Sequence, residues 1–229
     1  MNNEILISCC IIAVMAVLMN LKALGKNPYI SLKIIVSLLV SLTSLRYITL
    51  IAYGNSAEYH LLYVLRYFYF MSSIGVTMTT VSAIWYITPC YREKISYPYF
   101  LACFLPWILF YLYLILKQPT QIIQGSQFGY QLILKGKFPF YLSIAQSSFV
   151  IIAMTLCLIG ILSYKHLQMR CQLFMIILAQ FLLALDSISY QKTSLRIFPP
   201  FTLTEAFAFF VTYYAFAKSV RMIHALKNQ

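Results

Sequence analysis

Long apolar runs alternate with short polar connections along the whole chain. A helix needs about 20 apolar residues to cross the hydrocarbon core of a membrane, and a β-barrel would instead show short alternating strands. We therefore predict an all-α integral membrane protein, a single seven-helix transmembrane bundle over residues 1–229. Of the predicted spans, the sixth has the weakest hydrophobic pattern, because it is short and contains Gln180 and Asp186. The predicted spans are residues 4–24, 30–53, 60–88, 97–116, 140–164, 171–189 and 201–223.

The connection between the fourth and fifth segments is the longest, and its centre is rich in Gln and Gly. Within it, "QLIL" at residues 131–134 fits either a short strand or a turn that lies on the membrane. The sixth and seventh segments are joined by a polar turn that ends in Pro199 and Pro200.

Composition supports a membrane protein. Hydrophobic residues make up 62% of the chain and charged residues 10%, whereas soluble domains are about 45–50% apolar and about 25% charged. We expect a multi-pass protein of the plasma membrane, in contact with the lipid bilayer. The formal net charge of +12 fits basic loops on the inner side and anchoring to anionic lipid. The sequence contains no long basic run, so we expect no nucleic-acid partner.

The order of charges predicts the orientation. Lys22 and Lys26 follow the first apolar run, which places the N-terminus outside and the C-terminus inside under the positive-inside rule. The expected outer residues are Lys117, Lys135, Lys137, Lys192 and Arg196. The expected inner residues are Lys22, Lys26, Lys33, Arg92, Lys94, Lys165, Arg170, Lys218, Arg221 and Lys227.

Four ionisable residues fall within the predicted spans: Arg46, Arg66, Asp186 and Glu205. Each would cost about 2.5–3.5 kcal/mol if it faced lipid, so such residues face the interior of a bundle. The rise of 1.5 Å per residue places all four in one layer, roughly 5–12 Å outside the midplane. Two cations and two anions in one layer can neutralise each other.

Three interpretations of this layer stay open. The arginines pair with the acids and fix the register of the helices, the layer binds a ligand that enters from outside, or an arginine extends to the outer interface. Supporting polar side chains are expected from Tyr67, Ser73, Gln146 and Thr204. The spacing of Ser72, Thr79 and Ser82 near Gly75 instead indicates close helix packing.

Motifs of the common hydrolases and transferases are missing from the sequence. The three histidines are far apart and no CxxC occurs, so we expect no metal site and no cofactor. An intramembrane enzyme would need two acids that share a water molecule, and the nearby arginines argue against that. We therefore expect no catalytic residues and no enzymatic activity.

The segment "LDSIS…FPPFTLTEAFAFFVTYYAFAKSVRMIHAL" resembles the end of the seven-transmembrane N-terminal sensor region of bacterial histidine kinases. The similarity extends to the layout of the chain, with its long outer connection and the basic turn "YKHLQMRCQ". In that family the seventh helix continues into a cytoplasmic signalling domain. The present sequence has no residues for kinase activity, so the resemblance implies a sensing role only.

Two functions follow as hypotheses. In the first, the protein is a receptor that detects an extracellular or membrane-borne ligand, such as a peptide or a small amphiphile, in a polar pocket of the outer half. It would signal to a cytoplasmic or membrane partner, and a second copy of the chain in a homodimer stays an open alternative. In the second, it is a non-catalytic accessory or immunity-type subunit that binds a partner membrane protein.

Overall fold

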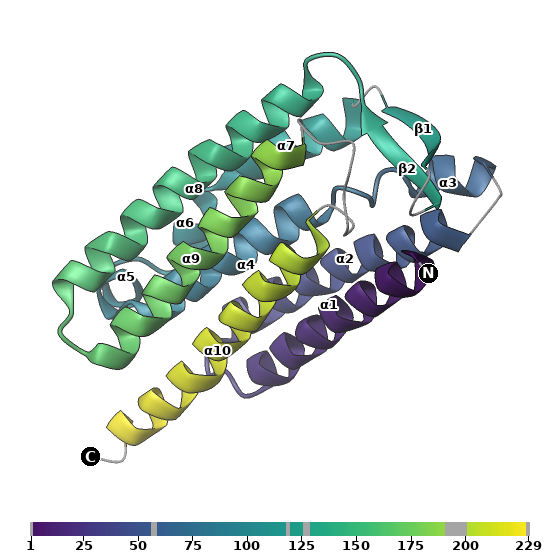
Figure 1. The fold of residues 1–229 in the computed structure, drawn as a ribbon. Coiled ribbons are helices and arrows are strands. Elements are labelled where there is room, and N and C mark those ends of the chain that lie inside the picture. The colour runs from purple at the N-terminus through teal and green to yellow at the C-terminus, as the bar shows by residue number, and fades with distance from the viewer. Residues whose placement is uncertain (1, 56–58, 118–119, 126–128, 191–200, 228–229) are drawn as a thin grey trace.

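The computed structural model describes residues 2–55, 59–117, 120–125, 129–190 and 201–227. In these residues the chain forms a bundle of helices with one β-hairpin (Figure 1). The elements are α1 (Asn2–Gly25), α2 (Ile30–Asn55), α3 (Tyr59–Leu65), α4 (Ser72–Ile87), α5 (Pro89–Lys94), α6 (Tyr97–Ala102), α7 (Leu105–Lys117), β1 (Thr120–Gly125), β2 (Gly129–Leu134), α8 (Phe138–Ser163), α9 (Leu167–Tyr190) and α10 (Thr202–Lys227).

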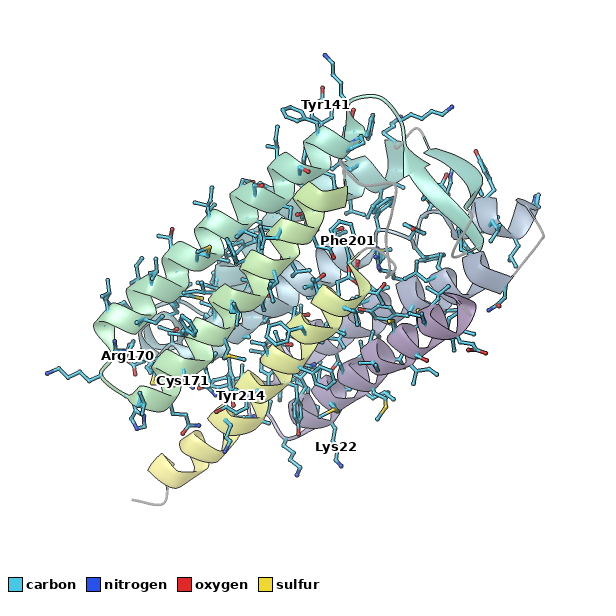
Figure 2. The ribbon with its side chains drawn as sticks, in the orientation of Figure 1. Lys22, Tyr141, Arg170, Cys171, Phe201 and Tyr214 are labelled. Atoms are coloured by element: carbon cyan, nitrogen blue, oxygen red, sulfur yellow. The ribbon has the colours of Figure 1, made fainter. Side chains whose placement is uncertain are left out.

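The two ends of the bundle carry different parts of the chain. Figure 1 shows the N-terminus, α3 and the hairpin at one end, which we call the hairpin end. The turn between α8 and α9, the helix α5 and the C-terminus lie at the other, which we call the C-terminal end. Lys22 and Arg170 project from the C-terminal end, and Tyr141 lies at the hairpin end (Figure 2).

Helix α4 lies at the centre of the bundle. All of its residues except Ser73 are buried, and it packs against α2, α9 and α10. Its buried Thr77, Thr79, Thr80 and Ser82 hydroxyls donate to carbonyl oxygens one turn earlier, which satisfies them inside the apolar core. A Cβ atom at Gly75 would collide with Thr43 Oγ1, so glycine allows α2 and α4 to approach closely here.

Two predicted spans are interrupted. The segment predicted as one helix over 60–88 consists of α3 and α4, joined by turns at residues 66–71 in which Phe68 and Met71 donate backbone hydrogen bonds three residues back. The prediction of one continuous helix is therefore wrong at these turns. The segment over 97–116 breaks between α6 and α7. Pro106 at the start of α7 has no N–H for a preceding helix, which explains this second break.

The long connection contains a β-hairpin, an element beyond the predicted all-α bundle. Strands β1 and β2 pair antiparallel from Thr120 opposite Leu134 to Gly125 opposite Gly129. The "QLIL" segment is therefore a strand, the first of the two alternatives. Strand β2 contacts α2, and its Leu132 is buried.

Four helices in the described part of the chain are long and apolar enough to cross a membrane: Glu4–Gly25, Ile30–Asn55, Phe138–Ser163 and Leu167–Ser187. Their outward faces carry large apolar side chains, such as Met15 and Ile151, which are 57% and 65% exposed. Such faces are favourable against lipid and unfavourable against water. Helix length and composition thus indicate a membrane protein.

Candidate functional site

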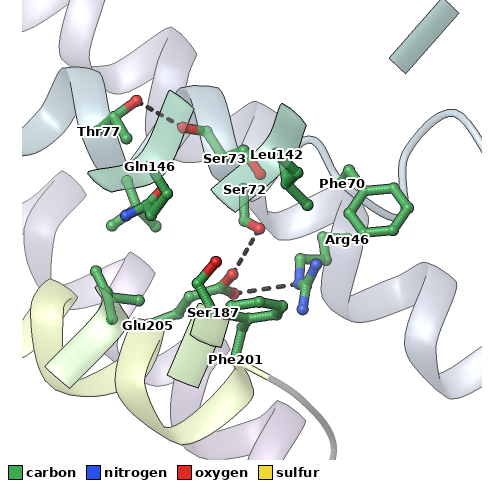
Figure 3. Close-up of a pocket in the computed structure, with 12 residues that line it drawn as sticks. Arg46, Phe70, Ser72, Ser73, Thr77, Leu142, Gln146, Ser187, Phe201 and Glu205 are labelled. Carbon is green, nitrogen blue, oxygen red and sulfur yellow. Dashed lines mark hydrogen bonds and ion pairs between the residues drawn. The ribbon is translucent and has the colours of Figure 1, made fainter. Parts of the chain in front are cut away.

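A buried ion pair joins α2 to α10. Arg46 Nε lies 3.2 Å from Glu205 Oε2, and the two side chains are only 1% and 6% exposed (Figure 3). Two charges removed from solvent are tolerated only when they are close and when other hydrogen bonds satisfy their remaining polar atoms. The pair therefore depends on the groups around it.

The Glu205 carboxylate also accepts hydrogen bonds from two side chains, one on α2 and one on α4. Tyr47 of α2 donates its hydroxyl to Oε2 at 3.2 Å, and Ser72 at the start of α4 donates to Oε1 at 2.6 Å. Glu205 thus fixes the position of α10 relative to both α2 and α4.

The Arg46 guanidinium is held by backbone and aromatic groups. Its Nη1 donates to the carbonyl oxygen of Tyr69, which lies in the turns between α3 and α4. The guanidinium carbon lies 5.6 Å from the centre of the Tyr69 ring and 5.9 Å from that of Phe201. Cation–π contacts of this kind stabilise a desolvated guanidinium. The interruption of the third predicted helix thus brings a carbonyl acceptor to Arg46.

Asp186 binds the start of α10. Its Oδ2 accepts hydrogen bonds from the Phe201 backbone N–H and the Thr204 hydroxyl, both at 2.9 Å. A carboxylate in this position accepts hydrogen bonds from N–H groups that have no partner within the helix. It also interacts favourably with the positive end of the helix dipole. Phe201 has a φ of 66°, which is uncommon for a residue with a side chain. Asp186 therefore connects the end of α9 to the first turn of α10.

The described contacts of Arg66 are with tyrosines. It lies over the ring of Tyr63, 3.9 Å from the centroid, and its Nη2 donates to the Tyr67 hydroxyl at 2.7 Å. Both tyrosines belong to its own segment. Of the four predicted charges, the structure thus brings Arg46 and Glu205 into contact, places Asp186 at the adjacent helix start, and surrounds Arg66 with tyrosines.

A cavity borders the ion pair. Beyond Arg46 and Glu205 its polar lining is Ser72, Ser73, Thr77, Gln146 and Ser187 (Figure 3). The space that the centres of water molecules can occupy is about 30 Å³, enough for about two waters. Of the predicted supporting residues, Ser73 and Gln146 line the cavity, Thr204 binds Asp186, and Tyr67 binds Arg66.

Sequence reasoning missed several partners of the pair. Tyr47 directly follows Arg46 in the sequence, but the pattern gave it no role. Ser72 was expected among the polar side chains of the layer and in a packing stripe, but its specific hydrogen bond to Glu205 was not. The Tyr69 carbonyl and the Phe201 ring could not be found from sequence, because a main-chain acceptor and a ring become relevant only after the chain has turned.

No family model and no curated protein matches this chain. Within the described residues, no group of three or more His, Cys, Asp or Glu side chains could hold a metal ion. The function must therefore be inferred from the geometry around Arg46 and Glu205.

Proposed function

We propose that this protein is a membrane receptor. It detects an extracellular or membrane-borne ligand in the polar cavity beside Arg46 and Glu205, and it signals to a cytoplasmic or membrane partner. The observation that supports this proposal is the position of the cavity, which borders an ion pair between α2 and α10. A structural ion pair alone does not require polar space beside it.

The contacts suggest how binding could be transmitted. Glu205 lies in the first turn of α10, and the helix continues from there to the C-terminal end. A ligand that binds one of two arrangements of the Glu205 contacts more tightly shifts the population toward it. Any shift of Glu205 relative to Tyr47 and Ser72 moves α10 against α2 and α4.

The proposal includes seven spans with the N-terminus outside. The α3–α4 and α6–α7 segments and α10 would cross the membrane together with the four helices named above. The distribution of basic side chains supports this orientation. The hairpin end has Lys117, Lys135 and Lys137, and the C-terminal end has Lys22, Lys26, Lys33, Arg92, Lys94, Lys165, Arg170 and Lys218. The other two expected outer residues, Lys192 and Arg196, lie outside the described residues.

The resemblance to the sensor regions of histidine kinases supports a signalling partner on the cytoplasmic side. A non-enzymatic role agrees with the use of the two acids, since Glu205 is engaged by Arg46, Tyr47 and Ser72, and Asp186 holds the start of α10.

The second candidate is an accessory or immunity-type subunit without a ligand. One observation favours it: both carboxylate oxygens of Glu205 are already engaged by groups of the protein itself. Such an arrangement would also be expected of a purely structural contact. This candidate predicts that Asp186→Asn lowers the amount of protein and has no further specific effect.

Transcript profiles of cells that carry the wild-type chain or Glu205→Gln test the receptor proposal. We expect the substitution to change the expression of a defined set of genes when both chains are expressed to the same protein level. Ser72→Ala, which removes one hydrogen bond and no charge, should change the same genes. Leu38→Ala is the control, because Leu38 is 59% exposed on α2. An unchanged profile in both site variants at normal protein levels would overturn the proposal.

A further inference from the structure

Two cavities lie next to each other in the bundle, and their walls differ in character. The first is the polar cavity beside Arg46 and Glu205. The second has little polar surface and is lined chiefly by apolar side chains of α7, α8 and the turn before α4. Phe70, Ser73 and Leu142 line both cavities, so the two spaces meet at these three side chains. A polar space therefore adjoins an apolar one, with these side chains between them.

The apolar cavity extends toward the hairpin end. Leu114 and Ile115 lie near the end of α7, and Phe138 is the first residue of α8, so these lining residues flank the hairpin on both sides in sequence. A molecule in both cavities would have its polar group beside the ion pair and its apolar part between α4, α7 and α8. This is the shape of an amphiphile.

The charges of the site indicate which polar group fits. Arg46 and Glu205 already neutralise each other at 3.2 Å. A charged group added beside them would be an uncompensated charge in a site removed from solvent. The other polar lining is neutral. In the described part of the chain the Gln146 carboxamide oxygen accepts a hydrogen bond from Tyr111 at 3.0 Å, which leaves its NH₂ group to donate to an occupant.

We propose that the two adjoining cavities together bind an uncharged amphiphile, with a hydroxyl or amide group beside Ser73 and Gln146 and an aliphatic chain beside Leu114, Ile115 and Phe138. This inference rests on the proposed receptor function, because it names the class of ligand for the same site. The space for water-molecule centres is about 30 Å³ in the polar cavity and about 10 Å³ in the apolar one. An occupant must therefore displace Phe70 and Leu142, the two large side chains at the junction.

Photolabelling of the purified full chain in lipid nanodiscs tests this proposal. The probe is decanamide with a diazirine at the end of its chain, and the labelled peptides are identified by mass spectrometry. We expect label on the peptides that contain Leu114 and Ile115 or Phe138. Unlabelled decanamide should compete at least about tenfold better than decyl sulfate or decyltrimethylammonium, because the permanently charged groups must be desolvated beside a neutral pair.

Substitutions at the junction provide the matched controls. Leu142→Trp fills the junction and should reduce labelling at least about fivefold, a loss of about 1 kcal/mol. Ile151→Trp is on the same helix, but its side chain is 65% exposed on the outer face, so labelling should be unchanged. Gln146→Leu removes one hydrogen bond to the amide and should weaken competition by decanamide about fivefold.

The labelling experiments test the class of ligand, and the transcript profiles test the receptor function. Equal labelling of Leu142→Trp and Ile151→Trp, or equal competition by decyl sulfate and decanamide, would overturn the uncharged amphiphile. The receptor proposal would then stand or fail on the transcript profile of Glu205→Gln. The expected labelling with no transcriptional effect of Glu205→Gln and Ser72→Ala would instead support the ligand class and contradict the receptor.

Discussion

Arg46 and Glu205 are far apart in the sequence, yet Arg46 Nε lies 3.2 Å from Glu205 Oε2 inside the bundle. Through this contact and its neighbours, one carboxylate and one guanidinium hold α2, the start of α4, the turns before α4 and the first turn of α10. The same pair borders the polar cavity. In the proposed receptor, ligand binding would therefore act on the same contacts that hold these helices together.

Removal of one member of the pair should be more damaging than removal of both. We expect Arg46→Met to lower the free energy of unfolding by about 3–5 kcal/mol, because it leaves the Glu205 charge buried without its partner. The double variant Arg46→Met with Glu205→Leu should recover most of that loss. Unfolding of the purified proteins in mixed micelles measures the stability of the wild type, the single variant and the double variant. A double variant less stable than Arg46→Met would contradict this account of the pair.

Asp186 should act through its hydrogen bonds to the start of α10. Asp186→Ala removes the acceptor of the Phe201 N–H and the Thr204 hydroxyl, and we expect a loss of about 0.5–2 kcal/mol, as for other helix caps. Asp186→Asn keeps an acceptor oxygen and should lose much less. Hydrogen exchange at the first turn of α10 reports the difference. Equal exchange in the two variants would show that the charge matters more than the hydrogen bonds.

Hydrophobic pattern and length were enough to predict a helical membrane protein, because a long apolar run has few other stable structures in lipid. The same pattern could not locate the interruption of the third predicted span. After Arg66, residues 67–71 are as apolar and aromatic as the helices around them. Their turns are stabilised by contacts from elsewhere, such as that between Arg46 and the Tyr69 carbonyl. Of the two interruptions described within predicted spans, the one at Pro106 has a local signal.

The expected site was partly found for an energetic reason. Charges within apolar segments are costly, so Arg46 and Glu205 were conspicuous in the sequence. Their specific pairing depends on the rotation of each helix about its axis, and this rotation could not be predicted from the sequence. For the same reason Asn20 was not singled out, although it donates to the Phe209 carbonyl and accepts from Thr212, and so connects α1 with α10.

Gly75 should be intolerant of any side chain. A Cβ atom there would collide with Thr43 Oγ1 and lie 3.0 Å from the Leu39 carbonyl oxygen. We expect Gly75→Ala to destabilise the protein by about 1–3 kcal/mol, as other overpacked sites do. Thr43→Ala removes the hydroxyl and should restore part of the loss. Gly25→Ala is the control, since its Cβ would meet nothing within 4 Å. Equal unfolding midpoints for Gly75→Ala and Gly25→Ala would exclude close packing of α2 and α4.

The proposed orientation predicts which side of the membrane each end of the bundle faces. Lys135 follows the hairpin and Lys26 lies between α1 and α2, and both side chains are exposed. With the exposed Cys103 and Cys171 replaced by Ser, cysteines introduced as Lys135→Cys and Lys26→Cys can be labelled with a maleimide that does not cross membranes. We expect intact cells to label Lys135→Cys at once and Lys26→Cys only after permeabilisation, because the positive-inside rule places the C-terminal end in the cytoplasm. The opposite pattern would invert the bundle and move the ligand cavity to the inner half of the membrane, whereas labelling of both sites in intact cells would mean that the two ends do not lie on opposite sides.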